Sequence, residues 1–262
     1  MDCKICKNPS SPLFKAKVMH KYEVQYYRCP HCFFVQTEQE YWLEEAYTSA
    51  LNVSDTGILY RNKKLFEKTF SILVSNFGKH GKYVDYGGGY GIFVRTMRDA
   101  GLDYYWQDIY AANLCARGFE YDPNTKYNAI STFEVFEHLT DPIEEIEKMF
   151  KLADTIIFST EIISDTPPAA SNWWYYGLEH GQHIALYSRK SLEYIAHYFD
   201  AKLYTDGKGF HTLSKNKLSH FSFILKLSKI GLPTLLKKFF KTKYYTDHLE
   251  LSQKYTNSEK VN

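Results

Sequence analysis

The stretch Val84-Asp85-Tyr86-Gly87-Gly88-Gly89-Tyr90-Gly91 decides the fold. It follows a short apolar segment and precedes an amphipathic one, so it predicts a strand, a glycine turn and a helix. Glycine lets a backbone turn tightly and lets a ligand approach where a side chain would collide. Because several cofactors bind at turns of this kind, the spacing of the glycines and the residues beside them must discriminate between ligands.

The glycine spacing disfavours nucleotides bound through a pyrophosphate. The dinucleotide fingerprint places glycine at its first, third and sixth positions, and Ile92 stands at the sixth position here. No Gly-Lys-Ser/Thr follows to make a phosphate loop. Asp85, two residues before the first glycine, would repel a pyrophosphate, whereas it would attract a sulfonium or ammonium group. The stretch therefore favours a cationic ligand.

Strands and helices alternate after this turn, which is typical of a parallel sheet with crossover helices. Leu59 to Val74 has a helical apolar repeat that ends at Gly78. The residue patterns predict strands at 82–85, 103–108, 127–133 and 155–159, helices at 92–100, 141–153 and 188–199, and a final antiparallel pair at 201–204 and 210–214.

Composition and charge set limits on the class of protein. The 262 residues suffice for one large core and a small satellite. With 32 basic and 30 acidic residues, no global charge selects nucleic acid or an anionic membrane as a partner. The first residues are polar where a secretory signal needs an apolar run, and no stretch reaches the roughly 18–20 apolar residues of a membrane span. We therefore expect a cytoplasmic protein.

Four cysteines form two pairs, Cys3-Lys4-Ile5-Cys6 and Cys29-Pro30-His31-Cys32. Each pair can turn two thiolates toward one point, and together they supply the tetrahedral sulfur set of a structural Zn(II) site. The alternative is redox chemistry, for which a single pair would suffice. Cys115 belongs to neither pair and is expected to be a small core residue.

The glycine motif and the segments after it resemble the class I S-adenosylmethionine-dependent methyltransferases over about residues 60 to 215. The resemblance implies an α/β fold with a doubly wound, mostly parallel sheet of the seven-stranded type, here with an N-terminal zinc ribbon. An acidic residue that closes the second strand takes both ribose hydroxyls in that family, and Asp108 stands there. The stretch from Tyr127 to Leu139 resembles the fourth strand and its Glu-His-Leu segment, although Asn128 replaces a common Asp. The implied cofactor-binding residues are Asp85, Tyr86, Gly87, Gly88, Gly89, Asp108, Ile109, Thr132, Phe133 and His138.

A long polar and aromatic loop, residues 172–184, follows the predicted fifth strand. Its segment Glu179-His180-Gly181-Gln182-His183 resembles one found in a subgroup that includes sugar C-methyltransferases, which also carry an N-terminal four-cysteine zinc module. Those enzymes continue into a sizeable extra domain, whereas about 45 residues follow the core here. An imidazole can take the proton that methyl transfer releases from the acceptor.

We nominate His180 as the general base and His183 as the second candidate, with Glu179 or Tyr176 as an orienting partner. The alternative is that these histidines cap the loop or bond backbone carbonyls.

These inferences predict a zinc module at 1–38, a helical linker at 39–80, a cofactor-binding core at 81–216 and a basic, helical extension at 217–262. The extension either packs on the core or contacts a membrane surface weakly. The expected activity is methylation of a small polar metabolite or an activated sugar of cell-surface polysaccharide synthesis. The alternative is a zinc-ribbon protein that binds nucleic acid or protein and whose methyltransferase fold is catalytically silent; balanced charge argues against an RNA substrate.

Overall fold

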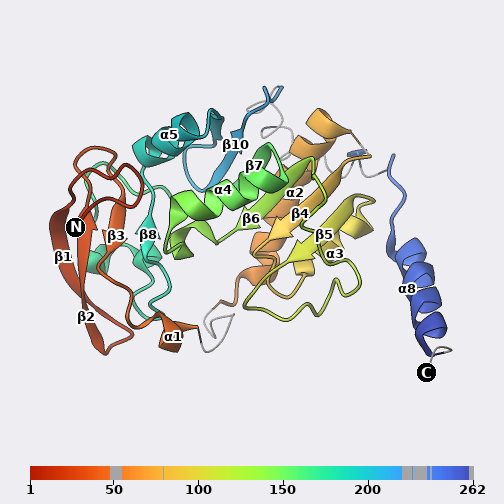
Figure 1. The fold of residues 1–262 in the computed structure, drawn as a ribbon, viewed down its shortest axis with the longest axis horizontal. Coiled ribbons are helices and arrows are strands. Elements are labelled where there is room, and N and C mark those ends of the chain that lie inside the picture. The colour runs from red at the N-terminus through yellow and green to blue at the C-terminus, as the bar shows by residue number, and fades with distance from the viewer. Residues whose placement is uncertain (48–54, 79, 220–225, 227–234, 237, 260–262) are drawn as a thin grey trace. The chain divides into compact units, whose positions relative to one another are not determined.

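The computed structural model describes residues 1–47, 55–78, 80–219, 226, 235–236 and 238–259 (Figure 1). The chain divides into two compact units. One comprises residues 1–55 and 132–217, and the other comprises residues 56–131 and 218–262. Two sheets occur in the described part of the chain, one of four strands in the order β1-β2-β3-β8 and one of six in the order β5-β4-β6-β7-β10-β9.

The six-stranded sheet confirms the predicted α/β, doubly wound fold class, with six strands among the described residues. β4 pairs in parallel with both β5 and β6, and β10 pairs antiparallel with β7 and β9. Every residue of β7 is buried, as expected for a strand covered on both faces. The strands span Lys82–Tyr86 (β4), Asp103–Gln107 (β5), Ala129–Phe133 (β6), Thr155–Ser159 (β7), Lys202–Thr205 (β9) and Phe210–Ser214 (β10).

Capping residues in the sequence mark where several helices begin and end. Asp141 caps α4 (Pro142–Leu152), with its carboxylate accepting from the Glu144 amide at 3.2 Å and proline at the first helical position. Ser188 caps α5 (Arg189–Tyr198) in the same way. In the unit that holds the glycine turn, α2 (Ile58–Phe77) ends at Gly78 and α3 (Ile92–Asp99) begins after Gly91.

The cysteine pairs lie beside a sheet that the N-terminal residues do not complete alone. β1 (Ser11–Val18), β2 (Tyr22–Arg28) and β3 (Val35–Thr37) form three of its strands, and α1 (Leu43–Ala46) follows. The fourth strand is β8 (Ala185–Leu186), which pairs antiparallel with β3 through Val35↔Leu186 and Gln36↔Ala185. The cysteine module and the histidine-bearing loop are therefore parts of one sheet system.

Two further predictions from the sequence concern Cys115 and the C-terminal extension. Cys115 is exposed, so its interpretation as a core residue is wrong: it lies in the irregular segment after Asp108, where its amide donates to the Tyr90 carbonyl at 3.0 Å. The membrane-surface contact was predicted for the extension at 217–262, of which residues 220–225, 227–234, 237 and 260–262 lie outside the described residues. Within the described part of the chain, no helix combines the length and apolar character that crossing a membrane requires.

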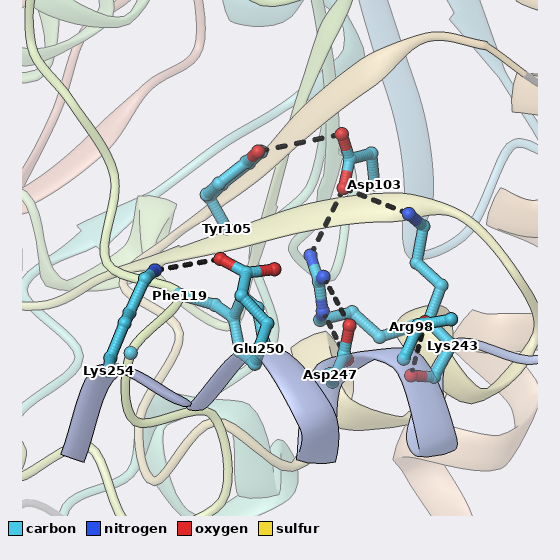
Figure 2. Close-up of a pocket in the computed structure, with 10 residues that line it drawn as sticks. Arg98, Asp103, Tyr105, Phe119, Lys243, Asp247, Glu250 and Lys254 are labelled. Carbon is cyan, nitrogen blue, oxygen red and sulfur yellow. Dashed lines mark hydrogen bonds and ion pairs between the residues drawn. The ribbon is translucent and has the colours of Figure 1, made fainter. Parts of the chain in front are cut away.

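The C-terminal helix α8 (Tyr244–Glu259) is held to α3 by a buried ion pair. The Arg98 guanidinium donates twice to the Asp247 carboxylate, at 2.7 Å each, and lies over the Phe119 ring at 3.6 Å. Arg95 adds a third bond of 2.7 Å to Asp247. Arg98, Phe119 and Asp247 are among the side chains that line a charged pocket (Figure 2), whose volume is about 480 Å³. Burial raises the pKa of Asp247, but the arginine hydrogen bonds outweigh it and hold that pKa below its usual value.

Replacing Asp247 with alanine should lower the free energy of unfolding by about 3–5 kcal/mol, because Arg98 would stay buried without its counterion. Urea denaturation measures this change. Glu250→Ala, on the same helix but in an exposed pair with Lys254, should change stability by less than about 1 kcal/mol. Equal effects of the two substitutions would contradict this account of the helix.

Candidate functional site

The glycine turn leaves space for a ligand beside its backbone. Gly87 and Gly89 have φ of 73° and 52°, in the left-handed region that favours glycine. The amides of Gly87 and Gly88 both donate to the Gln107 carbonyl at 2.9 Å, which fixes the turn against β5. A Cβ on Gly88 would lie 3.0 Å from the Trp106 ring, whereas a Cβ on Gly89 would meet no described atom within 4 Å. The open side of Gly89 is where a ligand can approach the main chain.

Asp85 presents a buried carboxyl in the same unit, next to the turn. It is 4% exposed, and the Ser131 hydroxyl donates to it. Burial raises the pKa of Asp85 to about 7; the negative charge of Asp108 also raises it, while the Ser131 bond opposes the change. A carboxyl that titrates near neutrality would be drawn to its ionised form by a bound cation, as expected for a sulfonium or ammonium ligand.

Asp108 holds the turn by accepting three backbone amides. Its Oδ2 accepts from Gly89 at 2.8 Å, and its Oδ1 accepts from Tyr110 and Ala111 at 2.7 and 2.8 Å. A carboxylate offers about four acceptor positions, so roughly one remains, on the oxygen beside Gly89. Ile109, the next residue, is 77% exposed. Binding of both ribose hydroxyls by Asp108 stays a prediction, and the remaining capacity fits one strong bond better than two.

The other unit holds the remaining predicted cofactor residues at and after the end of β6. The Thr132 hydroxyl is buried and has no hydrogen-bond partner among the described residues. Phe133 stacks with Phe210, their ring centroids 6.4 Å apart. His138 follows in a short 3-10 helix, Phe136–His138. An orphaned buried hydroxyl such as that of Thr132 is a group that a ligand could satisfy.

Three residues named from the sequence, His138, His180 and His183, come together in this unit. The His183 ring lies 5.0 Å from His138 and 4.7 Å from His180, measured between ring centroids. Glu137 joins them, since one ligand atom each of Glu137, His138 and His183 lie within 4.8 Å of one another. Glu137 was not among the site residues predicted from the sequence. Its position next to His138, shortly after a predicted strand, was the available signal.

Hydrogen bonds distinguish the two candidate bases. His183 Nδ1 lies 2.6 Å from the Tyr175 carbonyl oxygen, which can only accept, so Nδ1 carries the proton and Nε2 carries the lone pair. His180 Nδ1 accepts from the Gln182 amide at 3.2 Å, so its proton is on Nε2. The lone pair of His180, on Nδ1, thus accepts a hydrogen bond within the loop. The lone pair of His183, on Nε2, takes no part in the bond to the Tyr175 carbonyl.

Burial keeps these imidazoles neutral. It holds the pKa of His183 well below the usual value, helped by the positive charges that His138 and His180 would carry. The pKa of His180 is lowered by the same cause, against the attraction of Glu179. The Glu137 carboxyl is fully buried, and burial together with the Glu134 charge raises its pKa to about 8. At neutral pH the cluster therefore combines neutral imidazoles with a largely protonated carboxyl.

The predicted orienting partners are placed differently. Glu179 is exposed, while Tyr176 is buried and donates its hydroxyl to the Pro168 carbonyl at 2.8 Å. The Tyr176 ring packs edge-on against Phe14 of β1. This residue joins the loop to the first sheet, and its hydroxyl is engaged there.

The four cysteines of the two pairs converge in the same unit. Cys3 Sγ lies 3.5 Å from Cys32 Sγ, and Cys6 Sγ lies 3.4 Å from Cys29 Sγ, all of them buried. Sulfurs bound tetrahedrally to zinc at about 2.3 Å are roughly 3.8 Å apart, so the donor set and its spacing fit Zn(II). No described disulfide joins these thiols.

The family model for a methyltransferase domain matches residues 59–205, more than half of the chain. The chain belongs to this methyltransferase family. It is an S-adenosylmethionine-dependent enzyme. No curated protein matches the sequence.

Solved structures similar to this methyltransferase include two named enzymes of low identity. Magnesium protoporphyrin IX methyltransferase from Synechocystis PCC 6803, with bound S-adenosylhomocysteine, is 16% identical with a TM-score of 0.44, over 65% of this chain and 90% of that chain. An O-methyltransferase family protein from Burkholderia thailandensis is 12% identical with a TM-score of 0.44, over 67% of this chain and 68% of that chain.

The affinity for S-adenosylmethionine should rise as the pH increases from about 6 to 8, because ionised Asp85 attracts the cationic cosubstrate and its pKa lies at about 7. Asp85→Asn should bind more weakly and lose this pH dependence. Calorimetric titration at several pH values measures both. Asp122→Asn, at an exposed site, is the matched control, and a pH dependence that survives in Asp85→Asn would show that another group is responsible.

Asp108→Ala should weaken cosubstrate binding by about 1–3 kcal/mol, the loss expected for charge-assisted hydrogen bonds. Calorimetry measures the affinity, and thermal unfolding reports whether the turn survives without its three amide contacts. An unchanged dissociation constant would refute the ribose assignment. Asp99→Ala, on the surface of α3, controls for a general loss of negative charge.

Proposed function

We propose that this methyltransferase acts on a small polar metabolite or an activated sugar, with His183 as the group that accepts the proton from the methyl acceptor. The observation that carries the proposal is the bond from His183 Nδ1 to the Tyr175 carbonyl at 2.6 Å, which leaves the lone pair on Nε2. Burial of the ring keeps it neutral and ready to accept. The lone pair of His180 is already used, because its Nδ1 accepts from the Gln182 amide. His180 is therefore the second candidate.

The chemistry requires little more than alignment and removal of a proton. S-adenosylmethionine supplies the methyl group at its sulfonium, and the residues that would hold it are Asp85, the turn at Gly87–Gly89, and Asp108. The protein must orient the acceptor and receive its proton, steps for which positioned groups are efficient. The exposed Trp174 and the buried Tyr175 stand on the same loop as His183 and would border the acceptor.

The proposed substrate class rests on the resemblance to the subgroup that includes sugar C-methyltransferases, in which a four-cysteine module precedes the core. Zn(II) bound by Cys3, Cys6, Cys29 and Cys32 would be structural, because four sulfurs leave no coordination position open. Bound zinc would also stabilise the end of the histidine-bearing loop. The Ser188 hydroxyl, two residues after β8, donates to the Cys32 carbonyl at 2.8 Å. We therefore propose a role in cell-surface polysaccharide synthesis, with the module supporting the acceptor loop.

We also propose the domain bounds, the location and the partner that the sequence predicts. These are the segments 1–38, 39–80, 81–216 and 217–262 as organisational units, a cytoplasmic location, and a small-molecule partner rather than nucleic acid. The balanced charge of 32 basic and 30 acidic residues supports the last of these.

His183→Ala should slow turnover by about a hundredfold or more while sparing the affinity for S-adenosylmethionine, because it removes the proton acceptor alone. His180→Ala should have a smaller effect, and His197→Ala, on the exposed side of α5, should have none. A screen of nucleotide sugars and small phosphorylated or amide-bearing acceptors with isotopically labelled S-adenosylmethionine first identifies the substrate. Full activity in His183→Ala would remove this residue as the base.

A further inference from the structure

Glu137 is a buried acid without a described use. Its side chain is fully buried, and neither carboxyl oxygen makes a hydrogen bond of full geometry among the described residues, with the Tyr175 and Thr160 hydroxyls as its polar neighbours. A buried polar group without a partner costs free energy, so such groups in native proteins usually meet a ligand, an ion or water. The proton transfer proposed above does not employ Glu137. An ion bound from outside the chain would satisfy both carboxyl oxygens.

Two imidazoles share this space with Glu137. One ligand atom each of Glu137, His138 and His183 lie within 4.8 Å of one another. Donor atoms around a tetrahedral zinc ion, with bonds of about 2.0–2.2 Å, are roughly 3.3–3.6 Å apart. Side-chain shifts of about 1 Å would close the difference. The two segments are already joined, because the Ile184 amide donates to the Glu137 carbonyl at 2.9 Å.

The outer contact of His183 is that of a metal ligand, and a hydroxyl contact orients the His138 ring. A ligating imidazole usually bonds through its second nitrogen to a carbonyl, carboxylate or similar group, which orients the ring. His183 does this through Nδ1 to the Tyr175 carbonyl, leaving Nε2 for a metal. The His138 Nδ1 lies 2.9 Å from the Tyr47 hydroxyl. Both rings are held in place before any ion binds.

We propose that Glu137, His138 and His183 form a second metal site, separate from the four cysteines, for a divalent transition ion such as Zn(II). Two imidazoles and one carboxylate suit zinc, cobalt or nickel, whereas magnesium and calcium prefer oxygen ligands alone. Three protein ligands leave a coordination position open, unlike the closed four-sulfur set.

Metal binding has a direct consequence for turnover. The ion would occupy Nε2 of His183, which is the lone pair assigned to the acceptor proton. One nitrogen cannot hold a metal and receive a proton at once, so the loaded second site inhibits the enzyme. This consequence rests on the proposed function, while the metal site itself does not.

The site is tested by metal content and by spectroscopy on the full chain. Wild-type protein, purified with zinc at its cysteines, should take up one further equivalent of Co(II) with the weak visible bands of nitrogen and oxygen ligation. Cobalt that displaces zinc from the cysteines would instead give intense thiolate charge-transfer bands. Glu137→Gln and His183→Ala should lose the further equivalent, and His197→Ala should keep it. Uptake equal to wild type in both site variants would overturn the proposal.

Added Zn(II) tests the consequence separately. One equivalent beyond the cysteine site should inhibit turnover, and a mild chelator should restore it. Zinc uptake at the second site without inhibition would overturn the mutual exclusion. If no second metal binds but His183→Ala still slows turnover, only the metal site is refuted. If metal binds and His183→Ala is fully active, only the assignment of the base is refuted. Circular dichroism of each variant verifies folding.

Discussion

The short antiparallel pairing of β3 with β8 is the constraint on which the histidine loop depends. Only two residue pairs form it, Val35↔Leu186 and Gln36↔Ala185, yet it joins the cysteine module to the end of the loop that carries His180 and His183. The Thr37 amide extends the contact by donating to the Ile184 carbonyl at 3.1 Å. With the end of the loop anchored in this way, the Tyr175 carbonyl can hold His183 in one tautomer. A module remote in sequence thus contributes to the order of these histidines.

Two buried carboxyls show how environment gives similar groups different tasks. Asp85 and Glu137 both have pKa values raised by burial, to about 7 and about 8. Asp85 has the Ser131 hydroxyl as a partner, which favours its ionised form. For Glu137, burial and the nearby Glu134 charge favour the protonated form. The first is suited to a permanent cation, and the second to a ligand that displaces a proton.

Local chemistry made much of the fold predictable from the sequence. The glycine turn, the Asp141 cap and the apolar strands gave element boundaries within one or two residues of those observed. The pairing of β8 was beyond reach because two residues carry no periodicity, and the contact spans about 150 positions. The sequence named the histidines, but it could not rank His183 above His180, since the ranking depends on which nitrogen meets a backbone group. Cys115 was misplaced because a small thiol carries no sign of its exposure.

The glycines of the loop that carries His180 and His183 restrict how this loop can change over evolution. Gly177 and Gly181 both have positive φ, and an added Cβ would lie 2.4 Å from the His180 ring at the first and 2.7 Å from Val18 at the second. Neither position can accept a side chain without moving the loop. Trp174, which is 75% exposed, is free of that limit. Divergence among related enzymes should therefore accumulate at such outward positions, with the inner face of the loop inherited almost unchanged.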